Sequence, residues 1–96
     1  MQGKMGGMVI NNETDSRYEV HVDGQLAGQL DYQLIGDVIA LTHTEVDDAY
    51  AGQGLGGQLA KFALDDAQAR GLKVSPICPF VAKYIDKHPE YRVTVR

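Results

Sequence analysis

A cluster of glycines directly before an amphipathic stretch constrains this chain more than any other feature. Residues 52–57 read Gly-Gln-Gly-Leu-Gly-Gly. Apolar residues then recur at the spacing of one helix face, at Leu55, Leu59, Phe62, Ala63 and Ala67. Glycines let backbone N–H groups approach a ligand closely, and the first N–H groups of a helix have no partner within it. The pattern therefore predicts a turn that opens a helix and binds an anion, for which pyrophosphate is the usual occupant.

Alternating apolar residues predict three strands before this turn, over Arg17–Val22, Gln25–Leu34 and Val38–Val46. The first two are joined by Asp23-Gly24, a strong signal for a two-residue hairpin because both positions tolerate positive φ. In the second strand we expect Leu26 on the same face as the later even-numbered apolar residues. Strands that follow one another through tight turns predict an antiparallel meander.

The chain beyond the helix predicts a crossover and a second helix. Gly71 fits the end of the first helix, and a short strand over Leu72–Ile77 should then run parallel to the third strand. Pro79 fits the first position of a second helix, which makes Cys78 its N-cap. A last short strand is expected over Tyr91–Val95. The fold class is therefore α+β, with a mixed sheet, a β-α-β crossover and a C-terminal helix.

Length and composition narrow the class of protein. The chain has 96 residues, enough for one small domain, which we expect over residues 16–96 after a flexible N-terminal segment at residues 1–15. The net charge is −4 and the nine Lys and Arg are scattered, unlike the basic face of a nucleic-acid-binding protein. No apolar run approaches the ~20 residues of a membrane span. One cysteine excludes an internal disulfide, and three widely spaced histidines show no metal-ligand spacing. We expect a cytoplasmic protein, monomeric or weakly dimeric, without a metal, nucleic-acid or membrane partner.

Two phosphate-binding motifs fit the glycine string poorly. A P-loop ends in Gly-Lys-Ser/Thr, which is missing here. The string matches the dinucleotide pattern G-x-G-x-x-G, but that fold places the motif after the first strand of a parallel sheet. It also requires an acidic residue about twenty positions on, where this chain has Ile77.

A third motif fits. The sequence resembles the GNAT superfamily of N-acetyltransferases, whose acetyl-CoA loop reads Arg/Gln-x-x-Gly-x-Gly/Ala, and here the loop is Ala51-Gly-Gln-Gly-Leu-Gly56. It looks most like the short stand-alone GNAT-like subfamily, through His43-Thr-Glu-Val46, Pro76-Ile-Cys-Pro-Phe80 and His88-Pro-Glu-Tyr91. Ala51 departs from the motif, so the cradle for the phosphates would depend on backbone N–H groups.

The resemblance implies an acetyl-CoA-dependent N-acetyltransferase acting on an unidentified primary amine, either a small molecule or a peptide. It implies that CoA is bound by Val46, Gly52, Gln53, Gly54, Leu55, Gly56 and Gly57, with a backbone N–H near Val46 as the oxyanion contact. The alternative is a non-catalytic CoA-binding or protein-interaction module on the same fold. The glycine turn could also serve only to pack the helix against the sheet.

Four residues are candidates for the chemistry. The helix dipole favours a thiolate at Cys78, which could attack the thioester, line the pocket or be an inert core residue. Tyr84 resembles the GNAT tyrosine that protonates the departing CoA thiolate, although its apolar neighbours also predict a core position. His43 and Glu45 share one face of the third strand, and either side-chain type can take a proton from an attacking ammonium. Both could instead be a solvated strand end.

Overall fold

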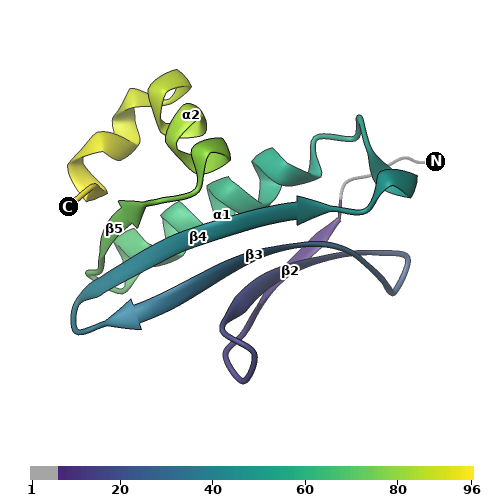
Figure 1. Ribbon diagram of the computed structural model, residues 1–96, viewed down its shortest axis with the longest axis horizontal. Coiled ribbons are helices and arrows are strands. Elements are labelled where there is room, and N and C mark those ends of the chain that lie inside the picture. Colours follow the sequence, from purple (N-terminus) through teal and green to yellow (C-terminus); the bar gives the residue numbers. More distant parts are fainter. Residues whose placement is uncertain (1–6) are drawn as a thin grey trace.

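The computed structural model describes residues 7–96, so the expected flexibility of residues 1–6 lies outside it. One five-stranded sheet holds the strands side by side in sequence order (Figure 1). The strands are β1 (Met8–Asn12), β2 (Arg17–Val22), β3 (Gln25–Ile35), β4 (Val38–Val46) and β5 (Lys73–Pro76). The helices are α1 (Leu55–Ala69) and α2 (Pro79–Lys87), with short 3-10 turns η1 (Asp48–Tyr50) and η2 (Pro89–Thr94). Strands β1 to β4 are antiparallel, and β5 runs parallel to β4 after the α1 crossover.

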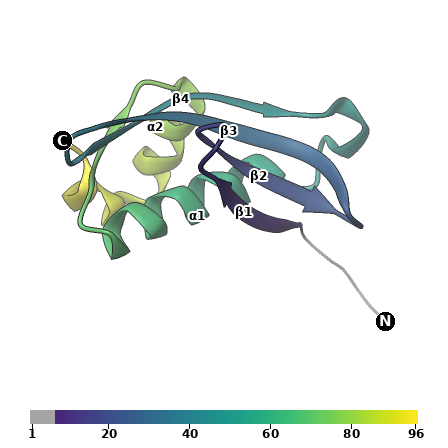
Figure 2. The same cartoon turned by 90° about the horizontal axis from the view of Figure 1, so that it is seen from below.

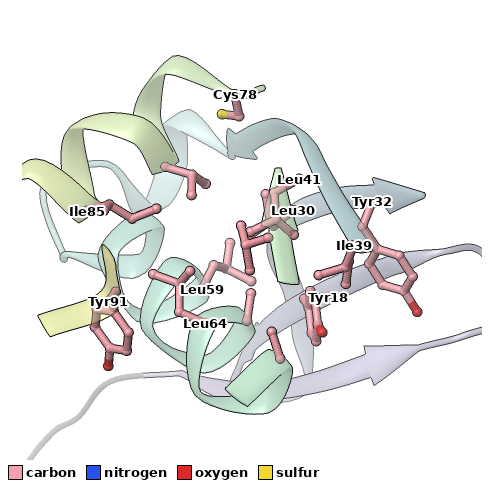
Figure 3. Close-up of a cluster of buried hydrophobic side chains, with 14 of the residues drawn as sticks. Tyr18, Leu30, Tyr32, Ile39, Leu41, Leu59, Leu64, Cys78, Ile85 and Tyr91 are labelled. Carbon is pink, nitrogen blue, oxygen red and sulfur yellow. The ribbon is translucent and has the colours of Figure 1, made fainter. Parts of the chain in front are cut away.

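Both long helices lie on the same side of the curved sheet (Figure 2). The core lies between them and the sheet, and its members come from all of these elements (Figure 3). The largest fully buried side chains are Tyr18, Leu30, Ile39, Leu41, Leu55, Leu59, Leu64, Val20, Val74 and Val81. The other side of the sheet, the open face, carries no helix of residues 7–96 and presents Glu19, Gln29, Asp31, His43 and Glu45.

Strand β1 corrects the expectation that residues 1–15 form a flexible segment. Met8–Asn12 pairs with β2 and forms one edge of the sheet. Val9 lies opposite Val20 and packs against the core, and the Asn11 side chain accepts a hydrogen bond from the Tyr32 hydroxyl at 2.7 Å. The domain therefore begins before residue 16, because these contacts with distant residues stabilise a segment with weak local signals.

Two β-bulges change which side chains face the core. Ala27 is an extra residue between the pairs Val20–Gly28 and His21–Leu26, so Ala27 is buried and Leu26 is 43% exposed, against the prediction for Leu26. Thr42 is an extra residue between the pairs Tyr32–Leu41 and Asp31–His43. A bulge shifts the alternation of a strand by one residue. Each residue after Thr42 therefore points to the face opposite the one that unbroken alternation would give it.

The predicted strand over Tyr91–Val95 is wrong. Residues 89–94 form the 3-10 turn η2, and the only isolated β-bridge within residues 7–96 joins Val74 to Val95. The Tyr91 hydroxyl donates to Asp65 of α1 at 2.7 Å, and its ring is buried. The segment therefore packs against α1, and it contacts β5 through Val93, whose carbonyl accepts from Lys73 Nζ, and through the Arg96 N–H, which donates to the Val74 carbonyl.

One carboxylate on the open face is buried. Glu19 is 6% exposed, and it accepts hydrogen bonds from Asn12 at 2.9 Å and Arg17 at 2.7 Å and lies 3.0 Å from Nε2 of His21. The hydrogen bonds with Asn12 and His21 lower the pKa of Glu19 to about 2, although burial opposes them. These contacts join the end of β1 to β2.

The lowered pKa predicts a pH-dependent stability. A carboxyl group with a folded pKa of about 2 and an ordinary value of 4.5 stabilises the fold above pH 4.5 and loses this effect as the pH falls towards 2. We expect Glu19→Gln to lower the free energy of unfolding by about 1–2 kcal/mol at pH 7, allowing for solvent screening, and by much less near pH 2. Urea unfolding across this range measures it, with the exposed Glu45→Gln as control. An equal loss at both pH values would contradict the prediction.

Candidate active site

Strands β4 and β5 separate at the point where sequence analysis placed the chemistry. They pair over Val38–Leu41 and Lys73–Pro76, and the last link is the Cys78 N–H, which donates to the Leu41 carbonyl at 2.8 Å. Residues 42–46 of β4 continue without a β5 partner. We call the opening between residues 42–46 and Cys78 the fork.

Cys78 lies at the N-cap of α2, as predicted, with its side chain at the base of the fork. Its Sγ is 3.2 Å from Oγ1 of Thr44, and the residue is 4% exposed, at one end of the core in Figure 3. Burial is the largest influence and acts to raise the pKa, but the Thr44 hydroxyl and nearby backbone N–H groups outweigh it. The pKa of the Cys78 thiol is therefore lowered.

No local signal in the sequence marks the bulge at Thr42, so Thr44 was not among the predicted site residues. Leu30 faces the core and Thr44 lies opposite it, so Thr44 points towards the helices rather than towards the open face. Its hydroxyl can therefore reach Cys78.

The backbone of Val46 also faces the fork. The Asp47 N–H donates to the Ala27 carbonyl at 2.8 Å, which makes Gly28 and Val46 a pair without mutual hydrogen bonds. The N–H of Val46 therefore points away from β3 and into the fork. This orientation supports the prediction of an oxyanion contact there, on the same edge of β4 as Thr44.

The glycine turn forms the predicted opening of α1. Gly52 and Gly54 have φ of +83° and +75°, in the left-handed region that favours glycine. Gly54 is the N-cap, no side chain caps the helix, and the first turn contains no acidic residue. Gln53 is exposed, whereas Leu55 is buried in the core. The first N–H groups of α1 are thus available to an anion, and we call this turn, residues 52–57, the cradle.

Gly56 has a packing role that sequence analysis did not include. A Cβ built at Gly56 would lie 2.8 Å from the Phe80 ring, so a side chain there would displace this ring. A Cβ at Gly57 would lie an ordinary 3.8 Å from the Tyr84 ring. The start of α2 therefore packs directly against the cradle, and the absence of a side chain at Gly56 permits this approach.

Tyr84 lies on the wall of this cradle. Its ring stacks on His88, with centroids 4.1 Å apart. The hydroxyls of Tyr18, Tyr32 and Tyr91 each donate to a side chain, whereas that of Tyr84 forms no hydrogen bond within residues 7–96. Burial raises the pKa of Tyr84, so the hydroxyl is protonated at neutral pH and free to donate to a ligand.

His43 and Glu45 share one face of β4, but it is the open face. His43 Nε2 lies 3.4 Å from Glu45 Oε1, and these side chains are 60% and 72% exposed. Thr44 points the other way, so the sheet separates the His43–Glu45 pair from Cys78. The structure therefore brings Cys78, Val46 and the cradle to the helix side and leaves the two candidate bases on the other.

Two other features are absent from residues 7–96. No group of three or more His, Cys, Asp or Glu side chains in this range could hold a metal ion. No helix in the same range has the length and apolarity needed to cross a membrane.

Comparison with known proteins identifies the class. A family profile described as GCN5-related N-acetyl-transferase matches residues 17–94, and the chain belongs to this family. Protein NATD1 of Gallus gallus and of Homo sapiens are each 41% identical to it over 59 residues, which is 60% of this chain. The matched part is 54% and 52% of those proteins, so the chain spans about half the length of the curated relatives it matches.

Solved structures confirm the predicted GNAT-like fold. A GCN5-like putative N-acetyltransferase from Staphylococcus aureus aligns over 97% of this chain and 91% of its own, with a TM-score of 0.71 and 20% identity. The ribosomal-protein-S18-alanine N-acetyltransferase from Escherichia coli aligns over 60% of this chain and 38% of its own, with a TM-score of 0.58 and 27% identity.

Proposed function

We propose that this chain transfers the acetyl group of acetyl-CoA to a primary amine. The observation that carries the proposal is the uncapped start of α1 beside a fork that contains the Cys78–Thr44 pair. The cradle suits the pyrophosphate, and the fork suits the thioester end of the same molecule. Membership of the family, whose profile matches residues 17–94, supports this assignment.

The residues of the fork suit a two-step transfer. The Cys78 thiolate would attack the thioester carbonyl carbon, while the N–H of Val46 stabilises the negative charge on the carbonyl oxygen. As the bond from this carbon to the CoA sulfur breaks, Tyr84 would give its proton to the departing thiolate. The amine would then attack the acetyl-cysteine, and Cys78 would leave as a thiolate.

The amine would reach the fork from the open face. His43 and Glu45 are exposed there, on the part of β4 that has no β5 partner. Because the sheet separates both side chains from Cys78, either would take the proton that the amine loses through a bridging water molecule. If Cys78 only lines the pocket, the same base would serve a direct attack of the amine on the thioester.

The test is amine-dependent release of CoA. The purified chain is incubated with acetyl-CoA and a panel of small amines, polyamines and peptides, and free CoA thiol is followed over time. We expect release above the rate without protein for at least one class of amine. Binding of CoA without release by any amine would favour a non-catalytic CoA-binding module. Failure to bind CoA would contradict the whole assignment.

Tyr84→Phe tests the proposed acid. The substitution keeps the ring beside Gly57 and removes only a hydroxyl that forms no hydrogen bond within residues 7–96. We expect turnover to fall roughly 10²-fold, typical for the loss of an acid catalyst, with CoA affinity little changed. Tyr50→Phe, in the η1 turn, is the control. Unchanged turnover in Tyr84→Phe would show that Tyr84 is not the acid and has only a packing role.

A further inference from the structure

The His-Pro-Glu-Tyr motif at residues 88–91 directly follows α2 and has no part in the proposed transfer. Pro89 disfavours a helical backbone at the residue before it, and His88 leaves the helix with φ of −132° and ψ of 71°. The N–H of His88 donates to the Ile85 carbonyl at 3.0 Å, whereas a continued α-helix would direct it to the Tyr84 carbonyl. The Tyr84 carbonyl therefore lacks its helical partner.

The side chain of His88 replaces this missing hydrogen bond. Its Nδ1–H donates to the Tyr84 carbonyl at 2.9 Å, which fixes the imidazole over the last turn of α2. The same imidazole lies on the Tyr84 ring, with centroids 4.1 Å apart and an angle of 18° between the planes. One side chain thus contacts both the backbone and the ring of Tyr84.

Tyr91, the last residue of the motif, fixes the backbone that carries His88. Its N–H donates to the His88 carbonyl at 3.0 Å, and its hydroxyl donates to Asp65 of α1 at 2.7 Å. The Tyr91 ring is buried, and its centroid lies 6.2 Å from that of Tyr84. The segment after α2 is therefore attached to α1, the helix that the cradle opens, and His88 is held against Tyr84 from both sides of the motif.

The Tyr84 hydroxyl has no protein partner that would orient it. It forms no hydrogen bond within residues 7–96, so the contacts of the ring set its direction. His88 covers one face of this ring, and a Cβ built at Gly57 would lie 3.8 Å from its edge. A proton donor must lie within hydrogen-bond reach of the atom that it protonates. The orientation of the ring therefore decides whether the hydroxyl can serve as the acid.

We infer that His88 is a positioning residue, which holds the Tyr84 ring so that its hydroxyl faces the departing CoA sulfur. The inference rests on the proposed function, in which Tyr84 is the acid. Because His88 acts through this hydroxyl, its removal should affect turnover only while the hydroxyl is present.

A double-mutant cycle tests this coupling. Turnover with acetyl-CoA and the most reactive amine is measured for the unmodified chain, His88→Ala, Tyr84→Phe and the double variant. We expect His88→Ala alone to lower kcat roughly 10-fold, with the KM for acetyl-CoA little changed, because a misdirected donor is lost to the transition state only. In the Tyr84→Phe background it should have no further effect. An equal loss in both backgrounds, or full turnover in Tyr84→Phe, would overturn the inference.

His88→Phe is the conservative variant. It keeps a flat ring against Tyr84 and removes the Nδ1–H donor, so it should restore most of the turnover that His88→Ala loses. His21→Ala is the matched control, because it removes an imidazole from β2, where Nε2 lies 3.0 Å from Glu19 on the open face. This control should leave kcat unchanged. Turnover as low in His88→Phe as in His88→Ala would contradict the stacking role.

NMR provides a readout that does not depend on turnover. The Tyr84 ring protons should show nuclear Overhauser contacts with the α-protons of Gly57, in line with the close approach of these two residues. We expect these contacts in the unmodified chain and in His88→Phe, and their loss in His88→Ala. Contacts that persist in His88→Ala would overturn the inference. If they are lost but no amine releases CoA, the proposed function fails while the role of His88 in holding the ring stands.

Discussion

Gly54→Asp should abolish CoA binding while the domain stays folded. Gly54 is the N-cap of α1, and nothing lies within 4 Å of a Cβ built there, so an aspartate fits without a clash. Its carboxylate would compete for the free N–H groups of the helix and repel the pyrophosphate. We expect affinity to fall roughly 100-fold or more, about 2.7 kcal/mol, as measured by calorimetry.

Gly54→Asn separates charge from backbone strain. Both variants must adopt a φ of +75°, which costs a residue other than glycine roughly 1–2 kcal/mol of stability and is best tolerated by Asn and Asp. Asn has the size of Asp without its charge, so most of the CoA affinity should remain. Equal binding by the two variants would show that the cradle does not hold the pyrophosphate.

Cys78→Ala should reduce acetyl transfer roughly 10³-fold or more if the thiol is the nucleophile. In the unmodified chain, acetyl-CoA should leave an adduct of roughly 42 Da on Cys78, detectable by intact-mass spectrometry. CoA should also protect this residue from iodoacetamide, because both reagents reach the sulfur through the fork. Full turnover in Cys78→Ala, or alkylation at an equal rate with CoA present, would contradict the nucleophilic role.

Thr44→Val tests whether the neighbouring hydroxyl influences the Cys78 thiol. It keeps the shape of the side chain and removes the hydroxyl 3.2 Å from Sγ. Because this hydroxyl lowers the pKa of Cys78, its loss should raise the pKa and move the alkylation profile to higher pH. A profile that does not move would show that Thr44 has no influence on the thiol.

Local chemistry was sufficient to predict most of the elements. The two strands on either side of Asp23-Gly24, the helix that the glycine turn opens and the start of α2 at Pro79 agree with the structure. Each depends on preferences of neighbouring residues, such as positive φ in a turn or the missing N–H of proline at a helix start. Such preferences act over a few residues, and they can therefore be read from the order of the side chains alone.

The faces and the burial of the site residues depended on contacts between distant parts of the chain. The bulge at Thr42 lies where β4 still pairs with β3 but its pairing with β5 has ended, and it sends His43 and Glu45 to the open face. The same bulge turns Thr44 towards Cys78, whose burial depends on the packing of α2 against α1. Strand β1 likewise forms only because β2 and the core provide its partners. Local preferences predicted which segments form strands and helices, whereas register and packing, which depend on distant partners, decided which of their side chains meet.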